Sequence, residues 1–450
     1  MGPDHPSASP RRASSWRLDA VHLIVGVACG LLLASLIQFA TSRLEPDLAR
    51  YREMRDFVRA NYVREVSPEE LLERALQGMV DGLDSYSRYY DRSAVASLDR
   101  ETSGHYLGIG IVFSRPLPQA GGEFRVLFSL PGSPAERAGI RPGDRIVSVD
   151  GRSVEQLGST ELQALISGAQ ETVLRLEVAG RDQRLRALQV RRQDLIDPTV
   201  RQARLLDRER GIGYVAISSF SQATPEEFDA ALEGMRSPEL RGLVVDVRGN
   251  LGGVLSSAVQ IANRFVPRGL LVSREGRGAP VSYEAEPKLA RFASLPLVVL
   301  VDGDSASASE VFAAALQEHR AAVVVGSPTY GKGVVQQMKR FQAPDGVAKI
   351  TTSYYYTPSH RNLERTLRSA WDCGVVPDLQ VELSPAEARR IHAFLASYSP
   401  PEAALGELEA WEREEGVEVV PTPPADAQLE AALALFRGER PGAYLAEAGR

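Results

Sequence analysis

Four short apolar runs, rich in β-branched residues, constrain the fold of this chain more than any other feature. They are GIGYVAI, GLVVDV, LVVLV and AAVVV, at residues 211–217, 242–247, 297–301 and 321–325. Compact apolar runs of this length are typical of strands buried on both faces of a sheet. Helical segments separate them, including one expected over about 308–319, and residues 349–353 add a further strand. Strands that alternate with helices indicate a mixed, mostly parallel sheet with helical crossovers.

The length of the chain requires more than one domain. It has 450 residues, whereas single cores stop growing near about 250–300 residues. The patterns predict five parts: an N-terminal segment with an apolar anchor (1–45), a helical segment (46–102), a β-rich domain (103–192), the α/β core (193–383) and a helical C-terminal extension (384–450).

Charge and composition exclude several kinds of partner. The net charge of −6 has both signs interspersed, whereas nucleic-acid binding requires a concentrated basic face, so no nucleic acid is expected. The two cysteines and six scattered histidines form no metal-ligand spacing. We therefore expect no metal and no other cofactor.

Residues 21–40 are long and apolar enough to cross a membrane as a helix. Arginines precede this run and acidic residues follow it, so the positive-inside tendency places the rest of the chain on the extracytoplasmic side, periplasmic or extracellular. A retained anchor is favoured because the run exceeds a usual signal core and no clean cleavage motif follows. A cleaved secretory signal and a lipid attachment at Cys29 remain open.

The β-rich segment carries a second recognisable pattern. Its run SPAERAGIRPGDRIVSVDGRSV, residues 133–154, resembles a PDZ domain, and YLGIGI at 106–111 is similar to the carboxylate-binding loop of such domains. Backbone N–H groups at a glycine-containing turn suit a peptide carboxylate, and the adjoining strand edge suits an extended peptide. The expected peptide-binding residues are Leu107, Gly108, Ile109 and Gly110. The alternative is that the glycines serve only a tight turn.

The run DGDSASASE, residues 302–310, follows a buried strand and opens a helix. Small residues allow a sharp turn there, and a helix N-terminus offers free N–H groups that suit an oxyanion. Taken alone, the same residues also fit an ordinary helix cap.

A lysine stands on a glycine-flanked turn in GSPTYGKG, residues 326–333. The run begins like a phosphate-binding loop, but Gly333 stands where that motif requires Ser or Thr, and a strand rather than a helix follows. A buried lysine with a lowered pKa is able to take a proton from a serine, whereas most lysines are solvated surface residues.

A third run, DVRGNLGG at 246–253, follows a buried strand at its carboxyl end, where active sites of open α/β sheets gather. Gly252 and Gly253 could present a backbone N–H to an oxyanion, or form a plain strand–loop–helix turn.

Together the three runs resemble the carboxyl-terminal processing (tail-specific) serine protease family, over residues 54–383. LDSYSRYYD (83–91), TTSYYYTPSHR (351–361) and GVVPD (374–378) extend the likeness. In that family the lysine stands 25 positions after the nucleophile, which selects Ser307 and Lys332 as the Ser-Lys dyad. The resemblance implies that Gln336 orients the lysine, and that the oxyanion donors are Ala308 and Gly252 or Gly253.

The sequence also departs from the family pattern. Leu251 stands where a proline is usual, Gly249 replaces a common asparagine, and His360 interrupts a PSGR-type run. The oxyanion loop and the substrate-side contacts are therefore the least constrained parts of the expected site.

The resemblance implies a serine endopeptidase that cleaves proteins near their C-termini after a PDZ domain captures the tail. Expected partners are proteins with unstructured C-terminal tails, and an adaptor or activating protein is a further candidate partner. A non-catalytic peptide-binding scaffold is the main alternative. A Ser/His/Asp hydrolase using His319 and Asp304 is weaker, because no G-x-S-x-G turn is present and His319 lies about three helical turns from Ser307.

Overall fold

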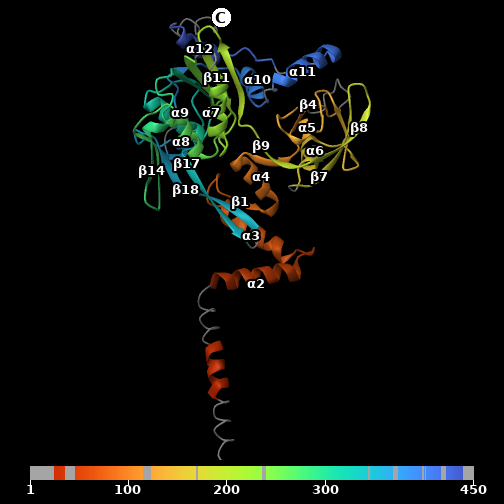
Figure 1. Cartoon of the computed structure of the whole chain (residues 1–450). Coiled ribbons are helices and arrows are strands. Elements are labelled where there is room, and N and C mark those ends of the chain that lie inside the picture. Colours follow the sequence, from red (N-terminus) through yellow and green to blue (C-terminus); the bar gives the residue numbers. More distant parts are fainter. Residues whose placement is uncertain are drawn as a thin grey trace, which may run out of the picture. The chain divides into compact units, whose positions relative to one another are not determined.

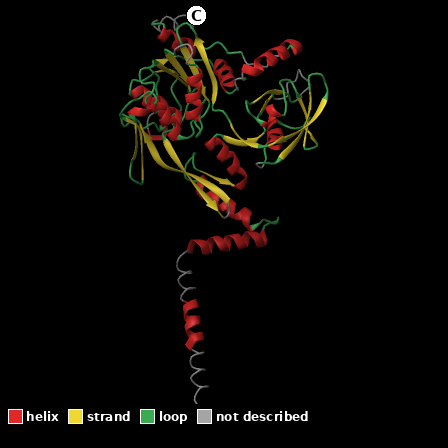
Figure 2. Cartoon of the chain, viewed as in Figure 1, coloured by secondary structure: helices red, strands yellow, loops and turns green. Residues whose placement is uncertain are grey.

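The computed structural model describes residues 25–35, 46–114, 123–168, 171–235, 240–342, 345–367, 373–397, 400, 402–416 and 422–438. They fall into two compact units, residues 1–82 and 83–450. Figure 1 labels many of the helices and strands, and Figure 2 colours the elements by type.

The first unit is helical. Residues 25–35 form an exposed helix, followed by α2 (Pro46–Asn61) and α3 (Pro68–Asp81). Ser67 caps α3 by accepting the N–H of Glu70 at 3.1 Å, and Pro68 takes the first turn, where its missing N–H costs nothing. No helix among the described residues combines the length and the apolar content needed to span a membrane. The predicted span at 21–40 extends beyond these residues at both ends, so it stays a prediction.

The α/β core is built on a six-stranded sheet of order β10-β11-β12-β15-β16-β19. The four predicted apolar strands are its central members and run parallel, which confirms the α/β prediction. Only β10 runs antiparallel to its neighbour. The bounds are β10 Val200–Asp207, β11 Ile212–Ile217, β12 Gly242–Asp246, β15 Leu297–Val301, β16 Val323–Gly326 and β19 Leu379–Gln380.

Helices cover both faces of this sheet. Helices α7 (Thr224–Gly234), α8 (Leu255–Asn263) and α9 (Ala308–Glu318) contribute buried side chains to the cluster on one face. On the other face, Ile391 and Phe394 of α10 (Pro385–Leu395) and Ala431 of α12 (Ala427–Phe436) pack with strand side chains. The C-terminal extension is therefore part of the core that buries the sheet.

A second sheet holds β1, β18, β13 and β14 in that order, with β17 paired to β18. All of its pairings are antiparallel, and the predicted strand at 349–353 lies within β18. The bounds are β1 Arg88–Asp91, β13 Leu270–Gly276, β14 Val281–Glu284, β17 Val334–Gln342 and β18 Asp345–Tyr356, with short 3-10 helices at Pro287–Leu289 and Arg365–Leu367 and the helix α4 at Arg92–Ser103.

The β-rich domain has its own apolar core, which includes Ile109, Ile146 and Leu162. It contains the pairs β2–β9 and β3–β4, the four-stranded sheet β6-β5-β7-β8, and two helices. The bounds are β2 His105–Gly108, β3 Ile111–Phe113, β4 Val126–Ser129, α5 Pro134–Arg137, β5 Arg145–Val149, β6 Arg152–Ser153, α6 Ser159–Ile166, β7 Val173–Ala179, β8 Leu185–Arg191 and β9 Gln193–Ile196. From the C-terminal extension, Leu408 and Trp411 of α11 (Glu402–Glu415) pack with Phe128 of β4.

Candidate active site

Ser307 lies at the turn between β15 and α9. It is the N-cap of α9, is 7% exposed, and has φ 56° and ψ −114°. A positive φ is costly for a residue with a Cβ, and such strain concentrates at functional sites. The Ser307 side chain lies close enough to Tyr355, a residue of β18, to lower the pKa of its hydroxyl. Burial raises the pKa of Tyr355 to about 12, so this partner is a neutral phenol.

A buried carboxylate joins two segments of the site. One is the serine turn, residues 302–307, and the other is the lysine loop, residues 327–333. Glu310, in the first turn of α9, is fully buried. Its Oε2 accepts the backbone N–H groups of Ser307 and Lys332, each at 2.8 Å. Its Oε1 accepts the N–H of Gly331 at 2.7 Å and the hydroxyl of Thr329 at 2.6 Å. Burial raises the pKa of Glu310, and the four hydrogen bonds oppose that rise.

Lys332 stands on the loop between β16 and β17. Its Nζ lies 4.8 Å from the centroid of the Tyr86 ring, which is cation–π distance. Tyr86 comes from the predicted family segment 83–91, and burial together with the nearby Glu364 carboxylate raises its pKa to about 12. Glu364 also accepts the N–H of Gly333 at 3.0 Å, next to the lysine. The amine therefore lies beside an aromatic ring on a loop fixed by two buried carboxylates.

Gln336 lies in β17, and its Nε2 donates to Thr351 Oγ1 across the β17–β18 pair at 3.4 Å. The N–H of Thr351 in turn donates to Ser87 Oγ at 3.0 Å. Ser87 also donates to Asp84 Oδ2 at 2.9 Å. These contacts connect Gln336 to the segment that carries Tyr86.

The glycine loop, residues 247–254 between β12 and α8, lies against Ser307. Gly252 has φ 103°, and a Cβ built on it would lie 2.9 Å from Ser307 Cβ. Its N–H donates to Asn250 Oδ1 at 2.9 Å. The N–H groups of Gly253 and Ala308 carry no hydrogen bond within the described part of the chain. Of the two predicted glycine donors, Gly253 is therefore the one whose N–H is available.

Asn250 fixes this loop to the serine turn. Its side-chain Nδ2 donates to Ile217 O at 2.8 Å, and its carbonyl accepts Ala306 N–H at 3.0 Å and Ser309 Oγ–H at 2.9 Å. Serine turn, lysine loop and glycine loop thus form one hydrogen-bonded cluster.

Sequence reasoning missed the roles of Asn250, Glu310, Tyr86 and Tyr355. Asn250 and Glu310 stand within the motifs that predicted the site, and Tyr86 and Tyr355 lie in segments of the family resemblance. Their contacts with the other loops had no signal in the sequence.

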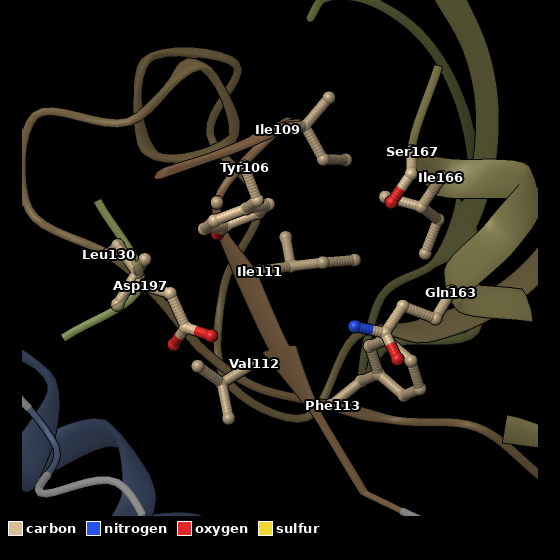
Figure 3. A pocket seen from close by; sticks show the side chains of 11 residues that line it. Tyr106, Ile109, Ile111, Val112, Phe113, Leu130, Gln163, Ile166, Ser167 and Asp197 are labelled. Atoms are coloured by element: carbon tan, nitrogen blue, oxygen red, sulfur yellow. The ribbon is translucent and has the colours of Figure 1, made fainter. Parts of the chain in front are cut away.

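A separate pocket lies in the β-rich domain, with Ile111 on one side and Gln163 and Ile166 of α6 on another (Figure 3). Of the predicted peptide-binding residues, Ile109 and Gly110 line this pocket. Leu107 and Gly108 belong to β2, where they are paired with Asp194 and Gln193 of β9.

Comparison with known proteins identifies three regions. Residues 211–381 match peptidase family S41, residues 129–180 match a PDZ domain, and residues 37–94 match the N-terminal domain of the activating protease CtpB.

One relative matches nearly the whole chain, and others match about three quarters of it. The carboxy-terminal-processing protease of Bartonella bacilliformis is 30% identical, over 93% of this chain and 96% of that protein. The carboxy-terminal processing protease CtpA of Bacillus subtilis is 30% identical, over 72% of this chain and 67% of that protein. A solved photosystem II D1 C-terminal processing protease is 29% identical, with coverage of 77% and 90% and a TM-score of 0.41. The chain is therefore a serine-type peptidase that belongs to the carboxy-terminal processing protease family, peptidase family S41, and carries a PDZ domain.

Proposed function

We propose that this peptidase cleaves proteins near their C-termini with Ser307 as nucleophile and Lys332 as general base. The observation that carries the proposal is the Glu310 carboxylate, because one oxygen of it accepts the N–H of both Ser307 and Lys332. That link keeps the two backbones adjacent. Gly252 lies against Ser307 and Ala308, and the N–H groups of Ala308 and of Gly253, the residue after Gly252, carry no hydrogen bond among the described residues. These two N–H groups are the proposed donors to the oxyanion.

In the proposed mechanism, the neutral amine of Lys332 takes the hydroxyl proton of Ser307 as Oγ attacks the carbonyl carbon of the scissile bond. The N–H groups of Gly253 and Ala308 donate to the oxyanion. Collapse of the tetrahedral intermediate breaks the C–N bond, and Lys332 returns the proton to the leaving amine. Water hydrolyses the acyl-enzyme by the same route and restores Ser307. Gln336 is assigned the role of orienting the lysine.

The PDZ domain is proposed to capture the substrate tail. The pocket between β3 and α6 supports this, because an extended peptide pairs with a strand edge while its side chains fill a neighbouring hollow. The amides near 107–110 would hold the terminal carboxylate. The substrates are then proteins with unstructured C-terminal tails, and an adaptor or activating protein is a further proposed partner.

A cleavage assay on a disordered protein with a free C-terminal tail tests this proposal. We expect S307A and K332A to abolish turnover while S307A still binds a tail peptide in a fluorescence-anisotropy titration. A tail peptide with an amidated C-terminus should bind more weakly than the free acid. Cleavage by S307A or K332A at the wild-type rate would refute the dyad. Equal binding of the amidated and free peptides would refute carboxylate capture without touching the dyad.

We also propose that residues 21–40 anchor the chain in a membrane, with the catalytic part on the extracytoplasmic side. The uncharged apolar run and its basic N-terminal flank support this. Carbonate extraction of membranes from cells that express the full chain tests the anchor. Protease treatment of intact spheroplasts from the same cells tests the orientation. Release by carbonate would contradict the anchor, and protection of the catalytic part in intact spheroplasts would contradict the orientation.

A further inference from the structure

Asp302 is the junction between the glycine loop and the serine turn. It follows β15, and its Oδ1 accepts the N–H of Gly249 at 3.0 Å and of Ser305 at 3.1 Å. Gly249 lies in the loop that leads to Gly253, and Ser305 lies two residues before Ser307. Orientation of one carboxylate therefore affects both segments that present the proposed oxyanion donors.

The second oxygen of Asp302 faces the C-terminal extension. His392 of α10 places its Nε2 2.5 Å from Asp302 Oδ2, and its Nδ1 lies 3.6 Å from Asp304 Oδ2. Its ring also lies against the glycine loop, because a Cβ built on Gly249 would be 3.5 Å from His392 Cδ2. His392 lies beyond the residues that match peptidase family S41, 211–381.

The charges around His392 favour its cationic form. Its hydrogen bond to Asp302 raises the pKa of His392, burial lowers it, and the charges of Asp302 and Asp304 raise it further, so the net direction is upward. Arg248 opposes the rise, and Glu382 lines the same hollow. Burial alone would raise the pKa of Asp302, but the His392 bond and the N–H donors outweigh burial and lower it. Both pKa shifts therefore favour the ionic form of the pair over its neutral form.

Asp426 of the C-terminal extension also holds the glycine loop, through Arg248. Arg248 precedes Gly249, is 1% exposed, and binds Asp246 of β12 with Nη2 at 2.6 Å. Its Nη1 and Nη2 also bind both oxygens of Asp426, the N-cap of α12, at 2.9 and 2.6 Å. Since Arg248 is neutralised by these two carboxylates, it fixes the base of the loop and leaves His392 as the cation that faces Asp302.

We propose that His392 is a positioning residue for catalysis: its ion pair with Asp302 aligns the glycine loop and the serine turn, so that the Gly253 and Ala308 N–H groups point at the same oxygen. This role rests on the proposed dyad and oxyanion donors. Loss of the cation leaves a buried carboxylate without its counter-charge, and such a group reorients or takes up a proton. The oxyanion donors then shift, which weakens binding of the transition state more than capture of the tail.

The proposed role of His392 predicts that kcat falls at alkaline pH, which gives its pH profile a descending alkaline limb. As pH rises through the raised pKa of His392, the imidazole loses its charge and the ion pair is lost. The general base acts in the opposite sense, because deprotonation of Lys332 increases turnover. The His392 limb is therefore separable as a loss of kcat that a side chain of higher pKa at position 392 moves to higher pH.

Full-length H392Q and H392K test the proposal against R389Q, which removes an exposed cation from the same helix. For H392Q we expect kcat on a tailed, disordered substrate to fall about tenfold at pH 7 with little change in KM, since displaced oxyanion donors act on the transition state. The alkaline limb should vanish. H392K should recover most of kcat and move that limb to higher pH, and R389Q should match wild type throughout.

Two results would overturn the role of His392. One is a wild-type kcat and pH profile in H392Q. The other is an equal loss in H392Q and H392K together with a lowered Tm, which identifies a merely structural helix contact. S307A, assayed in parallel, reports on the dyad separately. If S307A is inactive and H392Q behaves as wild type, only the positioning role of His392 is refuted. If S307A is active, the proposed dyad itself is refuted.

Discussion

Glu310 accepts the backbone N–H of Lys332 at 2.8 Å, although the two residues lie on opposite sides of the strand β16 in the sequence. The same oxygen accepts the N–H of Ser307, which Glu310 also follows in the first helical turn. Within the described part of the chain, three backbone N–H groups and one hydroxyl donate to this buried carboxylate. Its geometry therefore sets the separation of the proposed nucleophile and the proposed general base.

Replacement of Glu310 by Gln should lower kcat about 100-fold, because a small displacement of reacting groups costs that much. The amide nitrogen of Gln is unable to accept, so it leaves two buried N–H or O–H donors without a partner, at a cost of about 1–3 kcal/mol each in unfolding free energy. Cleavage kinetics and urea unfolding measure the two effects. E407Q in α11 is a control at an exposed glutamate. Wild-type kcat in E310Q would show that the carboxylate does not position the dyad.

Tyr86 should act through its ring and not through its hydroxyl. Its ring lies 4.8 Å from Lys332 Nζ, and a contact of this kind contributes about 0.5–2 kcal/mol. We therefore expect Y86F to keep kcat close to wild type and Y86A to lower it about two- to thirtyfold. Single-turnover kinetics with a tailed substrate distinguish the two variants. Equal losses in Y86F and Y86A would assign the effect to the hydroxyl and contradict the ring contact.

The sequence predicted the four central strands of the parallel sheet, because each of them is a compact apolar run of its own. The antiparallel sheet was not predicted, since its pairings join distant segments: Arg88 of β1 is paired with Lys349 of β18. Several of its strands also carry exposed polar residues, as in β14, where three of the four residues are exposed. Local apolar patterning gives no signal for such strands.

The sequence motifs predicted Ser307 and Lys332 as site residues, but not the side chains that bind to their backbones. A glutamate three residues after a helix cap is ordinary in any helix, so nothing local marks Glu310 as the residue that reaches a loop 22 positions away. The choice between Gly252 and Gly253 likewise depends on Asn250 Oδ1, which occupies only the first N–H. His392 lies in a segment without any motif, and only its packing brings it to Asp302.

Gly253 should tolerate no side chain. Its φ is 134°, and a Cβ would lie 2.1 Å from the carbonyl oxygen of Phe220, so G253A must move the loop. We expect kcat to fall by about 100- to 1000-fold, the usual cost of losing one oxyanion donor. Tail binding measured in the S307A background should be unchanged, and G278A, where a Cβ meets no atom within 4 Å, is the control. Wild-type turnover in G253A would assign the oxyanion to another donor.

The ion pair of His392 with Asp302 should also appear in the pH dependence of stability. The folded pKa of Asp302 is lowered from 3.8, so its contribution is present above that pH and is lost as pH falls through the folded value. The folded pKa of His392 is raised from 6.5, so its contribution is complete below that pH and is lost as pH rises through the folded value. Both contributions coexist between about pH 4 and 6.5.

The difference in unfolding free energy between wild type and H392Q should therefore be largest in that window and should shrink on either side of it. Urea unfolding from pH 3.5 to 9 measures it, with R389Q as the control that removes a solvent-exposed charge from the same helix. A difference that stays constant across the range would show that the histidine contributes packing and not charge. A difference that grows above pH 7 would show that the neutral imidazole is the form that stabilises the fold, contrary to the ion pair.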